Sequence, residues 1–136
     1  MGGGKQIAGV IVKGLGEGFF FMSMLHYKNE IKKKLGFDAY PGTLNAKITE
    51  KEFNELKTNL PIKIEGYKRG SKIFGGAGCR RAKLRNIEGA IIMPDINKHK
   101  DILEFIAPVH IKSQLNLKDG DKVELKIFNH WKKNST

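Results

Sequence analysis

The chain has 136 residues, of which 40% are hydrophobic and 29% are charged, a size and composition typical of one globular domain with its own core. It contains no apolar run of the roughly 20 residues that a membrane-spanning helix needs, and its first residues lack the apolar stretch of a secretory leader. The single cysteine, Cys79, excludes an internal disulfide and a cysteine-cluster metal site. We therefore expect one cytoplasmic domain over residues 1–136.

The net charge of the chain is +11, from 25 Lys and Arg against 14 Asp and Glu. A surplus of this size favours anionic partners, which are either nucleic acid or a phosphorylated small molecule. Lysines that are simply solvated are the alternative interpretation. Charge alone does not decide between nucleic acid, a phosphorylated small molecule and solvated lysines.

A glycine-rich elbow follows the first predicted strand. Residues 6–13 are rich in β-branched side chains and predict a strand, after which comes Gly14-Leu15-Gly16-Glu17-Gly18. Glycines at every second position allow consecutive N–H groups to turn toward one anion, so a phosphate cradle is one interpretation. A hairpin turn into a second strand at 19–22 is the other. The elbow alone does not decide between them.

Two short helices are predicted in the first half of the chain. Apolar residues at i, i+4 and i+8 over 27–35 indicate one buried stripe on a lysine-rich helix, and Gly36 is a suitable stop. Thr49 and Glu52 have the spacing of a capping box, which predicts a helix over 50–57. The lysines of the first helix are interpreted as its solvent face.

Two small oxygen-bearing side chains share one face of the strand between these helices. A Pro-Gly turn at 40–42 leads into residues 43–48, whose alternation predicts a strand with one apolar face. Thr43 and Asn45 project from the other face, two residues apart. They are either the exposed polar face of a half-buried strand or a pair of ligands.

The second half of the chain is predicted to be mainly strands. The segment 66–71 is interpreted as a loop, and the basic segment 79–85 as a solvated edge strand or an anion contact. A helix is predicted around Glu104 from the apolar spacing of its neighbours, and a tight turn at 117–121 precedes the last strand. Cys79 has no activating histidine nearby and is interpreted as unreactive. Strands are predicted at 62–65, 79–85, 88–93 and 123–127, and a short helical or turn segment at 109–115.

About seven short strands and three or four short helices, without regular β-α alternation, argue against a doubly wound sheet. A small closed barrel decorated by helices fits this pattern better, because closure removes exposed strand edges. The expected fold class is therefore mainly β with short helices.

Four stretches follow one another in a fixed order along the chain. They are Gly14-Leu15-Gly16-Glu17-Gly18, Pro41-Gly42-Thr43-Leu44-Asn45, Gly89-Ala90-Ile91-Ile92-Met93-Pro94, and Glu104-Phe105-Ile106-Ala107-Pro108 followed by Leu117-Lys118-Asp119-Gly120-Asp121. Together they resemble the archaeal CTP-dependent riboflavin kinases, over residues 6 to 127. The resemblance implies a six-stranded cradle-loop β-barrel, similar to riboflavin synthase domains, with residues 128–136 as a frayed tail. It also implies transfer of the γ-phosphoryl of CTP to the 5′-hydroxyl of riboflavin, giving FMN and CDP.

The resemblance further implies a nucleotide site in two parts. Phe19 stands where the family usually has a basic residue, so backbone amides are the expected phosphate ligands of the glycine loop. His110-Ile111-Lys112 stands where the family often has Lys-Leu-Arg, which removes one cation. The implied nucleotide-binding residues are Leu15, Gly16, Glu17, Gly18, Phe19 and Phe20 in the loop, and Val109, His110, Ile111 and Lys112 after the Ala-Pro pair.

For the metal, the resemblance implies Mg²⁺ held by Thr43 and Asn45, since neutral oxygen ligands suit a hard cation that keeps several waters. For the flavin, it implies Asn97 and Glu104, with Glu104 orienting riboflavin or its reacting hydroxyl. No catalytic base is identified. The expected partners are the substrates riboflavin and CTP, and we expect a monomer that binds neither membrane nor nucleic acid.

Two other functions remain open from the sequence. An AbrB-like DNA-binding barrel is suggested by the turn at 117–121 and by the positive charge, and it predicts DNA affinity that depends strongly on salt. A flavin-binding protein without kinase activity is the other.

Overall fold

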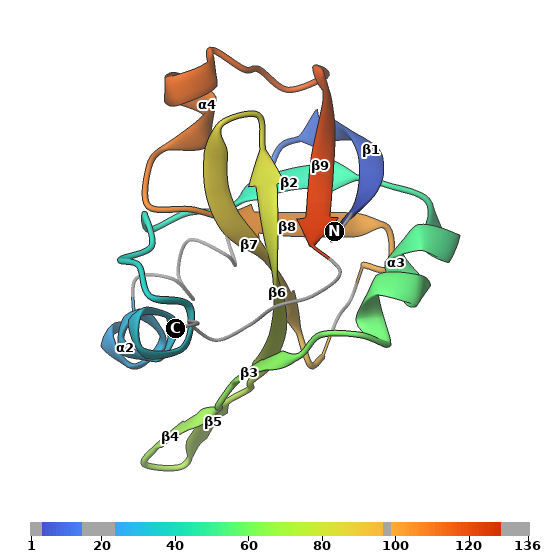
Figure 1. The fold of residues 1–136 in the computed structure, drawn as a ribbon. Helices are drawn as coiled ribbons and strands as arrows, with labels where there is room; N and C mark the ends of the chain where they lie inside the picture. The colour runs from blue at the N-terminus through green and yellow to red at the C-terminus, as the bar shows by residue number, and fades with distance from the viewer. Residues whose placement is uncertain (1–3, 15–23, 97–98, 129–136) are drawn as a thin grey trace.

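The computed structural model describes residues 4–14, 24–96 and 99–128 of the chain. These residues form a closed β-barrel with short helices packed outside it (Figure 1). The barrel strands are β1 (Gly4–Val12), β2 (Leu44–Lys47), β6 (Ala77–Leu84), β7 (Ile87–Pro94), β8 (Ile102–Ile106) and β9 (Lys122–Phe128). The other elements are helices α2 (Leu25–Leu35), α3 (Glu50–Lys57) and α4 (Ile111–Leu115), and strands β3 (Ile62–Ile64), β4 (Tyr67–Arg69) and β5 (Lys72–Phe74).

The barrel is a ring of six antiparallel strands in the order β6-β7-β8-β2-β1-β9. The ring closes because β9 pairs with β1 on one side and with β6 on the other, and β3 extends it at β6. The prediction of a mainly β, six-stranded barrel is confirmed. Within the described residues, none of the helices has the length and apolar character needed to cross a membrane.

Two apolar clusters hold the fold together. The larger one fills the barrel with residues that alternate along the strands, such as Val123, Leu125 and Ile127 of β9. The smaller one packs α2 against β3, β6 and β7 through the predicted stripe of Tyr27, Ile31 and Leu35. Burial of each such side chain contributes roughly 1.5–3 kcal/mol, so the stripe fixes α2 to the barrel.

The helix ends follow their predicted signals. Gly36 ends α2 with φ at 88°, a conformation that suits glycine, and its N–H reaches the carbonyl oxygens of the last turn. At the start of α3, the Thr49 hydroxyl accepts a hydrogen bond from the Glu52 N–H at 3.1 Å. The same hydroxyl donates to the Glu52 carboxylate at 3.1 Å, so the two residues cap the helix together.

The prediction of a helix around Glu104 is wrong, because residues 102–106 form strand β8 between β2 and β7. Leu103 and Phe105 face the barrel interior, while Ile106 belongs to the cluster under α2. A strand that is buried on both faces lacks simple alternation, so its apolar residues reproduce the spacing of a helix. As part of β8, Glu104 lies directly opposite Asn45 of β2.

The interpretation of 79–85 as an edge strand is also wrong. Strand β6 lies inside the ring, where it pairs with β3, β7 and β9. Arg80 is only 7% exposed, and its guanidinium donates to the backbone oxygens of Phe128 at 2.7 Å and Asn59 at 3.0 Å. This arginine therefore stabilises the structure at the end of β9.

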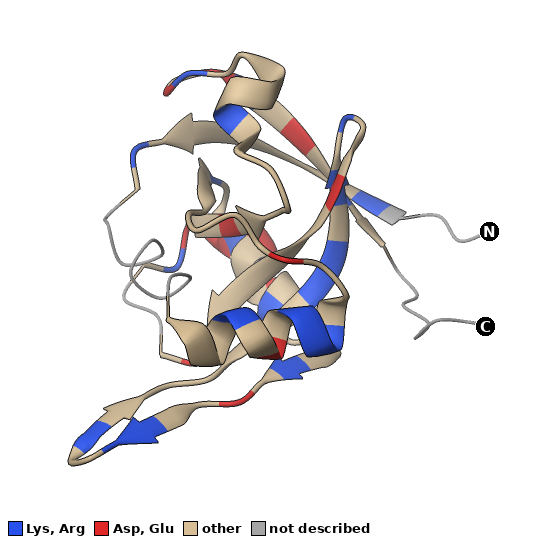
Figure 2. Cartoon of the chain, turned by 90° about the vertical axis from the view of Figure 1, so that its left-hand side faces the viewer, with Lys and Arg blue, Asp and Glu red and all other residues tan. Residues whose placement is uncertain are grey.

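The segment 66–71, predicted to be a loop, belongs to a β-hairpin of β4 and β5 that projects from the barrel and carries Lys and Arg toward its tip (Figure 2). Aromatic rings support its base, since His26 of α2 stacks on Tyr67 with ring centroids 4.8 Å apart. Short isolated hairpins are marginally stable in water, so this anchor is what fixes the hairpin to α2.

Candidate functional site

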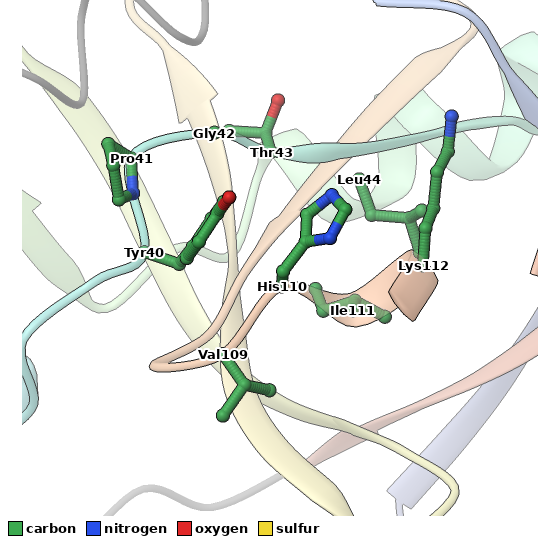
Figure 3. Close-up of a pocket in the computed structure, with 9 residues that line it drawn as sticks. All are labelled: Tyr40, Pro41, Gly42, Thr43, Leu44, Val109, His110, Ile111 and Lys112. Carbon is green, nitrogen blue, oxygen red and sulfur yellow. The ribbon is translucent and has the colours of Figure 1, made fainter. Parts of the chain in front are cut away.

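A pocket of about 280 Å³ opens at one end of the barrel, where β2 begins and the chain enters α4. Two segments that are far apart in the sequence line it, residues 40–44 and residues 109–112 (Figure 3). The backbone joins them, because the Tyr40 N–H donates to the Ala107 oxygen at 2.8 Å. The predicted metal-binding and nucleotide-binding segments therefore meet in one cavity.

The polar groups of the pocket come from both segments. The Thr43 hydroxyl and the Lys112 ammonium extend toward the same side of the pocket, with the His110 ring between them (Figure 3). His110 is held by a hydrogen bond between Nδ1 and the Ser113 hydroxyl and by its ring contact with Tyr40, at 4.9 Å between centroids. The pocket thus offers a hydroxyl, an imidazole and an ammonium group to a polar ligand.

Val109 and Ile111 contribute differently from their neighbours. Ile111 is buried in the barrel core, and Val109 packs against that core and points away from the polar groups in Figure 3. Of these two predicted nucleotide-binding residues, Ile111 is enclosed by the core, whereas Val109 is half-buried and lines the pocket with an apolar side chain.

Asn45 connects the pocket to the neighbouring strands. It lies opposite Val12 of β1 and opposite Glu104 of β8, so Asn45 and Glu104 project from the same face of the sheet. Gly14 approaches Asn45 so closely that an added Cβ would lie 2.7 Å from the Asn45 Nδ2. The start of the glycine elbow, the Thr43-Asn45 pair and Glu104 consequently gather at one end of the barrel.

The Thr43 and Asn45 side chains fit a hard cation. Asn45 Nδ2 lies 3.4 Å from both the hydroxyl and the backbone oxygen of Thr43, and rotating the amide by 180° would exchange Nδ2 for the Oδ1 acceptor. Over the described ranges, no group of three or more His, Cys, Asp or Glu side chains could hold a metal ion. A cation here would be bound by neutral oxygens, water and the phosphates of a ligand, as Mg²⁺ often is.

Lys112 forms an ion pair with Asp119, at 2.7 Å between Nζ and Oδ1, and both side chains are partly exposed. Partly exposed pairs of this kind are worth about 0–1 kcal/mol, so a phosphate can replace the carboxylate at little cost. Asp119 lies in the turn at 117–121, which is joined to β1 through the Gly120 N–H and the Ile11 oxygen at 2.7 Å. This turn therefore has a structural role at the barrel end.

The structure brings Thr43 and residues 109–112 together in the pocket. Asn45 and Glu104 do not line this pocket; they lie opposite each other on β2 and β8, and Asn45 adjoins Thr43. The predicted loop residues 15–20 and Asn97 lie outside the described residues. Sequence reasoning missed Tyr40 as a pocket residue and Asp119 as the partner of Lys112. Tyr40 was visible only as the residue before a Pro-Gly turn, and no sequence signal marked the pairing of Asp119.

The closed ring of six antiparallel strands, with a pocket lined by polar groups at its end, defines the class of this protein as a small β-barrel with a candidate ligand site. A protein-family model named CTP-dep_RFKase, with the description "Domain of unknown function DUF120", matches residues 11–127. The chain therefore belongs to this family, named for CTP-dependent riboflavin kinases, and the resemblance seen in the sequence is confirmed.

Curated relatives carry the name riboflavin kinase. The chain is 42% identical over 127 residues to a riboflavin kinase of Pyrobaculum calidifontis and 44% identical over 127 residues to one of Pyrobaculum islandicum, in each case covering 90% of this chain and 60% of the relative. It is 36% identical over 126 residues to a riboflavin kinase of Methanosarcina acetivorans, covering 90% of this chain and 53% of the relative. The chain thus matches little more than half the length of these relatives.

Proposed function

We propose that this chain is a CTP-dependent riboflavin kinase, which transfers the γ-phosphoryl group of CTP to the 5′-hydroxyl of riboflavin. The pocket carries the proposal, because it joins the start of β2 to residues 109–112 within a barrel of this family. Phosphoryl transfer needs alignment, charge neutralisation and exclusion of water more than covalent chemistry from the protein. A small site of positioned polar groups is sufficient for it.

CTP would bind with its phosphates between the glycine loop and the segment before α4. The amides of residues 15–20 are the proposed phosphate ligands, and Gly14, which directly precedes them in the sequence, lies against Asn45. Lys112 would exchange Asp119 for phosphate oxygens, and His110 would donate to the nucleotide from its fixed position. Ile111 would contribute backbone groups only, since its side chain packs with the core, whereas the half-buried Val109 also lines the pocket with its apolar side chain.

Thr43 and Asn45 are the residues that would hold Mg²⁺, which when bound would neutralise charge on the phosphates. Glu104, on the same face as Asn45, would orient riboflavin by accepting a hydrogen bond from its reacting hydroxyl, and Asn97 is the second proposed flavin contact. The hydroxyl oxygen attacks the γ-phosphorus, and its proton is released to solvent. The bond from that phosphorus to the bridging oxygen breaks, and CDP leaves with the electron pair.

The direct test is incubation of the protein with riboflavin, Mg²⁺ and each nucleoside triphosphate separately, with FMN separated by chromatography. We expect FMN with CTP. A clear preference for ATP would overturn the choice of donor, and a purified protein that binds flavin without turnover of any nucleotide would identify a non-catalytic flavin-binding protein instead.

The metal assignment is tested with Thr43→Ala combined with Asn45→Ala, which should abolish Mg²⁺-dependent FMN formation while thermal unfolding stays close to that of the parent protein. Thr58→Ala with Asn59→Ala is the matched control, because it removes the same two side-chain types at exposed positions after α3. Unchanged turnover in the double variant of Thr43 and Asn45 would overturn the assignment.

A further inference from the structure

A second and larger concavity, of about 690 Å³, lies on the outer face of the barrel over β6, β9 and β1. It shares no lining residue with the pocket at the barrel end. Four cationic side chains line it against a single carboxylate, that of Glu124. The cations are Lys83 and Arg85 from the β6 end and Lys122 and Lys126 from β9. We refer to this concavity as the basic groove.

The pairing of the strands places like charges against one another in the basic groove. Lys83 lies directly opposite Lys126 in the β6–β9 ladder, so both ammonium groups leave the same face of the sheet. Like charges at directly opposite positions are destabilising. The neutral Gln6 continues this row on β1, opposite Lys126. From β7 to β1 the row therefore reads Glu88, Lys83, Lys126 and Gln6, with the two cations adjacent at its centre.

Two neighbouring carboxylates compensate only part of the charge of the four cations. Glu124 lies between Lys122 and Lys126 along the same face of β9, and Glu88 is opposite Lys83 on β7. Yet among the described residues, none of the four cations of the groove forms an ion pair. Lysines elsewhere do pair, as Lys5 does with Glu55 at 2.7 Å.

We propose that the basic groove binds the phosphodiester backbone of a single-stranded nucleic acid. The cations are spread over the groove rather than gathered in one focused site, because Lys122 and Lys126 lie four residues apart on β9, about 13 Å, with Glu124 between them. The groove is built on paired strands, with β9 between β1 and β6 (Figure 1), so its charges are held without ordering a loop. Phe128, at the end of β9, lines the groove and supplies a ring on which a base can stack.

The groove differs from the site that suggested DNA binding from sequence, because the turn at 117–121 is engaged with β1. The inference is also independent of the proposed kinase activity, since the two concavities have separate linings. An anionic polymer would relieve the repulsion between Lys83 and Lys126, which a solvated surface would leave in place.

The test is fluorescence anisotropy of the full chain with a labelled single-stranded RNA or DNA of about 16 nucleotides, a length on the scale that single-strand binding sites span. With four phosphate contacts, we expect log affinity to fall with log salt at a slope of about −3. Lys83→Gln with Lys126→Gln should weaken binding by tenfold or more and reduce the slope to about half. The same variant should form FMN at the parent rate.

Lys32→Gln with Lys33→Gln on α2 is the matched control, because it removes the same charge from another exposed surface. Equal weakening in both double variants would show that only net charge matters, and unchanged binding in the groove variant would place the nucleic acid elsewhere. If CTP or inorganic phosphate displaces the oligonucleotide, and the affinity does not depend on oligonucleotide length, the groove is a site for small anions instead. A duplex that binds as tightly as the single strand, through the same two lysines, would overturn the assignment to single strands.

Discussion

Gly14→Ala tests whether the glycine elbow and the proposed metal ligand act together. The added Cβ would lie 2.7 Å from Asn45 Nδ2, and ordinary contact requires at least 3.4 Å, so the amide must move by about 0.7 Å. The atom that moves is the end of a flexible side chain, so we expect little loss of stability. A misplacement of about 1 Å in a catalytic constellation can reduce the rate by roughly 100-fold. We therefore expect FMN formation to fall by about 10- to 100-fold.

The assay is FMN formation as a function of Mg²⁺ concentration, with thermal unfolding recorded in parallel. Gly14→Ala should raise the Mg²⁺ concentration needed for half-maximal rate, and excess Mg²⁺ should restore part of the activity. Gly75→Ala is the control, because a Cβ at that glycine meets no atom within 4 Å. The coupling through Asn45 is refuted if Gly14→Ala lowers the rate without changing the Mg²⁺ dependence. It is also refuted if Gly14→Ala lowers the rate by the same factor in an Asn45→Ala background.

Three further predictions concern stability and reactivity. Gly89→Ala should destabilise the barrel by about 3 kcal/mol in urea unfolding, because its Cβ would overlap a backbone oxygen of β8 that cannot yield. Burial raises the pKa of Glu30, but hydrogen bonds from the Glu65 N–H and from Lys34 outweigh it and hold that pKa below its ordinary value. Glu30 therefore stabilises the fold above the pKa of the unfolded state, and the destabilisation by Glu30→Gln should shrink as the pH falls from 7 through 4. Burial raises the pKa of the Cys79 thiol to about 12, so a thiol reagent at pH 8 should label it only on unfolding, and rapid labelling of the native protein would contradict this.

The parts of the fold that sequence predicted are those with a local signal. Helix α3 begins at a Thr49-Glu52 pair that caps it through two hydrogen bonds within one turn, so its start is fixed by four consecutive residues. Strand β2 alternates because only one of its faces is buried. In both cases the determinants lie within a few residues of the element.

Strand β8 shows why the rest could not be predicted in the same way. Its two faces are buried by different clusters, the barrel interior and the packing under α2, so the decisive contacts come from distant residues. The buried position of Arg80 depends likewise on backbone oxygens of Asn59 and Phe128. No local pattern carries this information.

The candidate site, too, could be predicted only where local sequence determines it. The shared face of Thr43 and Asn45 follows from strand periodicity, so this pair could be proposed as ligands without knowledge of the neighbouring strands. Its position opposite Glu104 required the correct assignment of β8 as a strand. The pairing of Lys112 with Asp119 arises from a turn that returns toward α4, which spacing along the chain does not reveal.

The closure of the barrel also bears on how the protein is made. Strand β9 pairs with β1 from the start of the chain and with β6 from its middle, so these contacts span long stretches of sequence. Proteins dominated by such long-range pairing fold slowly, and strands that wait for their partners expose edges on which other chains can pair. During synthesis, β1 and residues 82–84 of β6 remain unpaired on one side until β9 has left the ribosome. The barrel is therefore at greatest risk of aggregation just before β9 is complete.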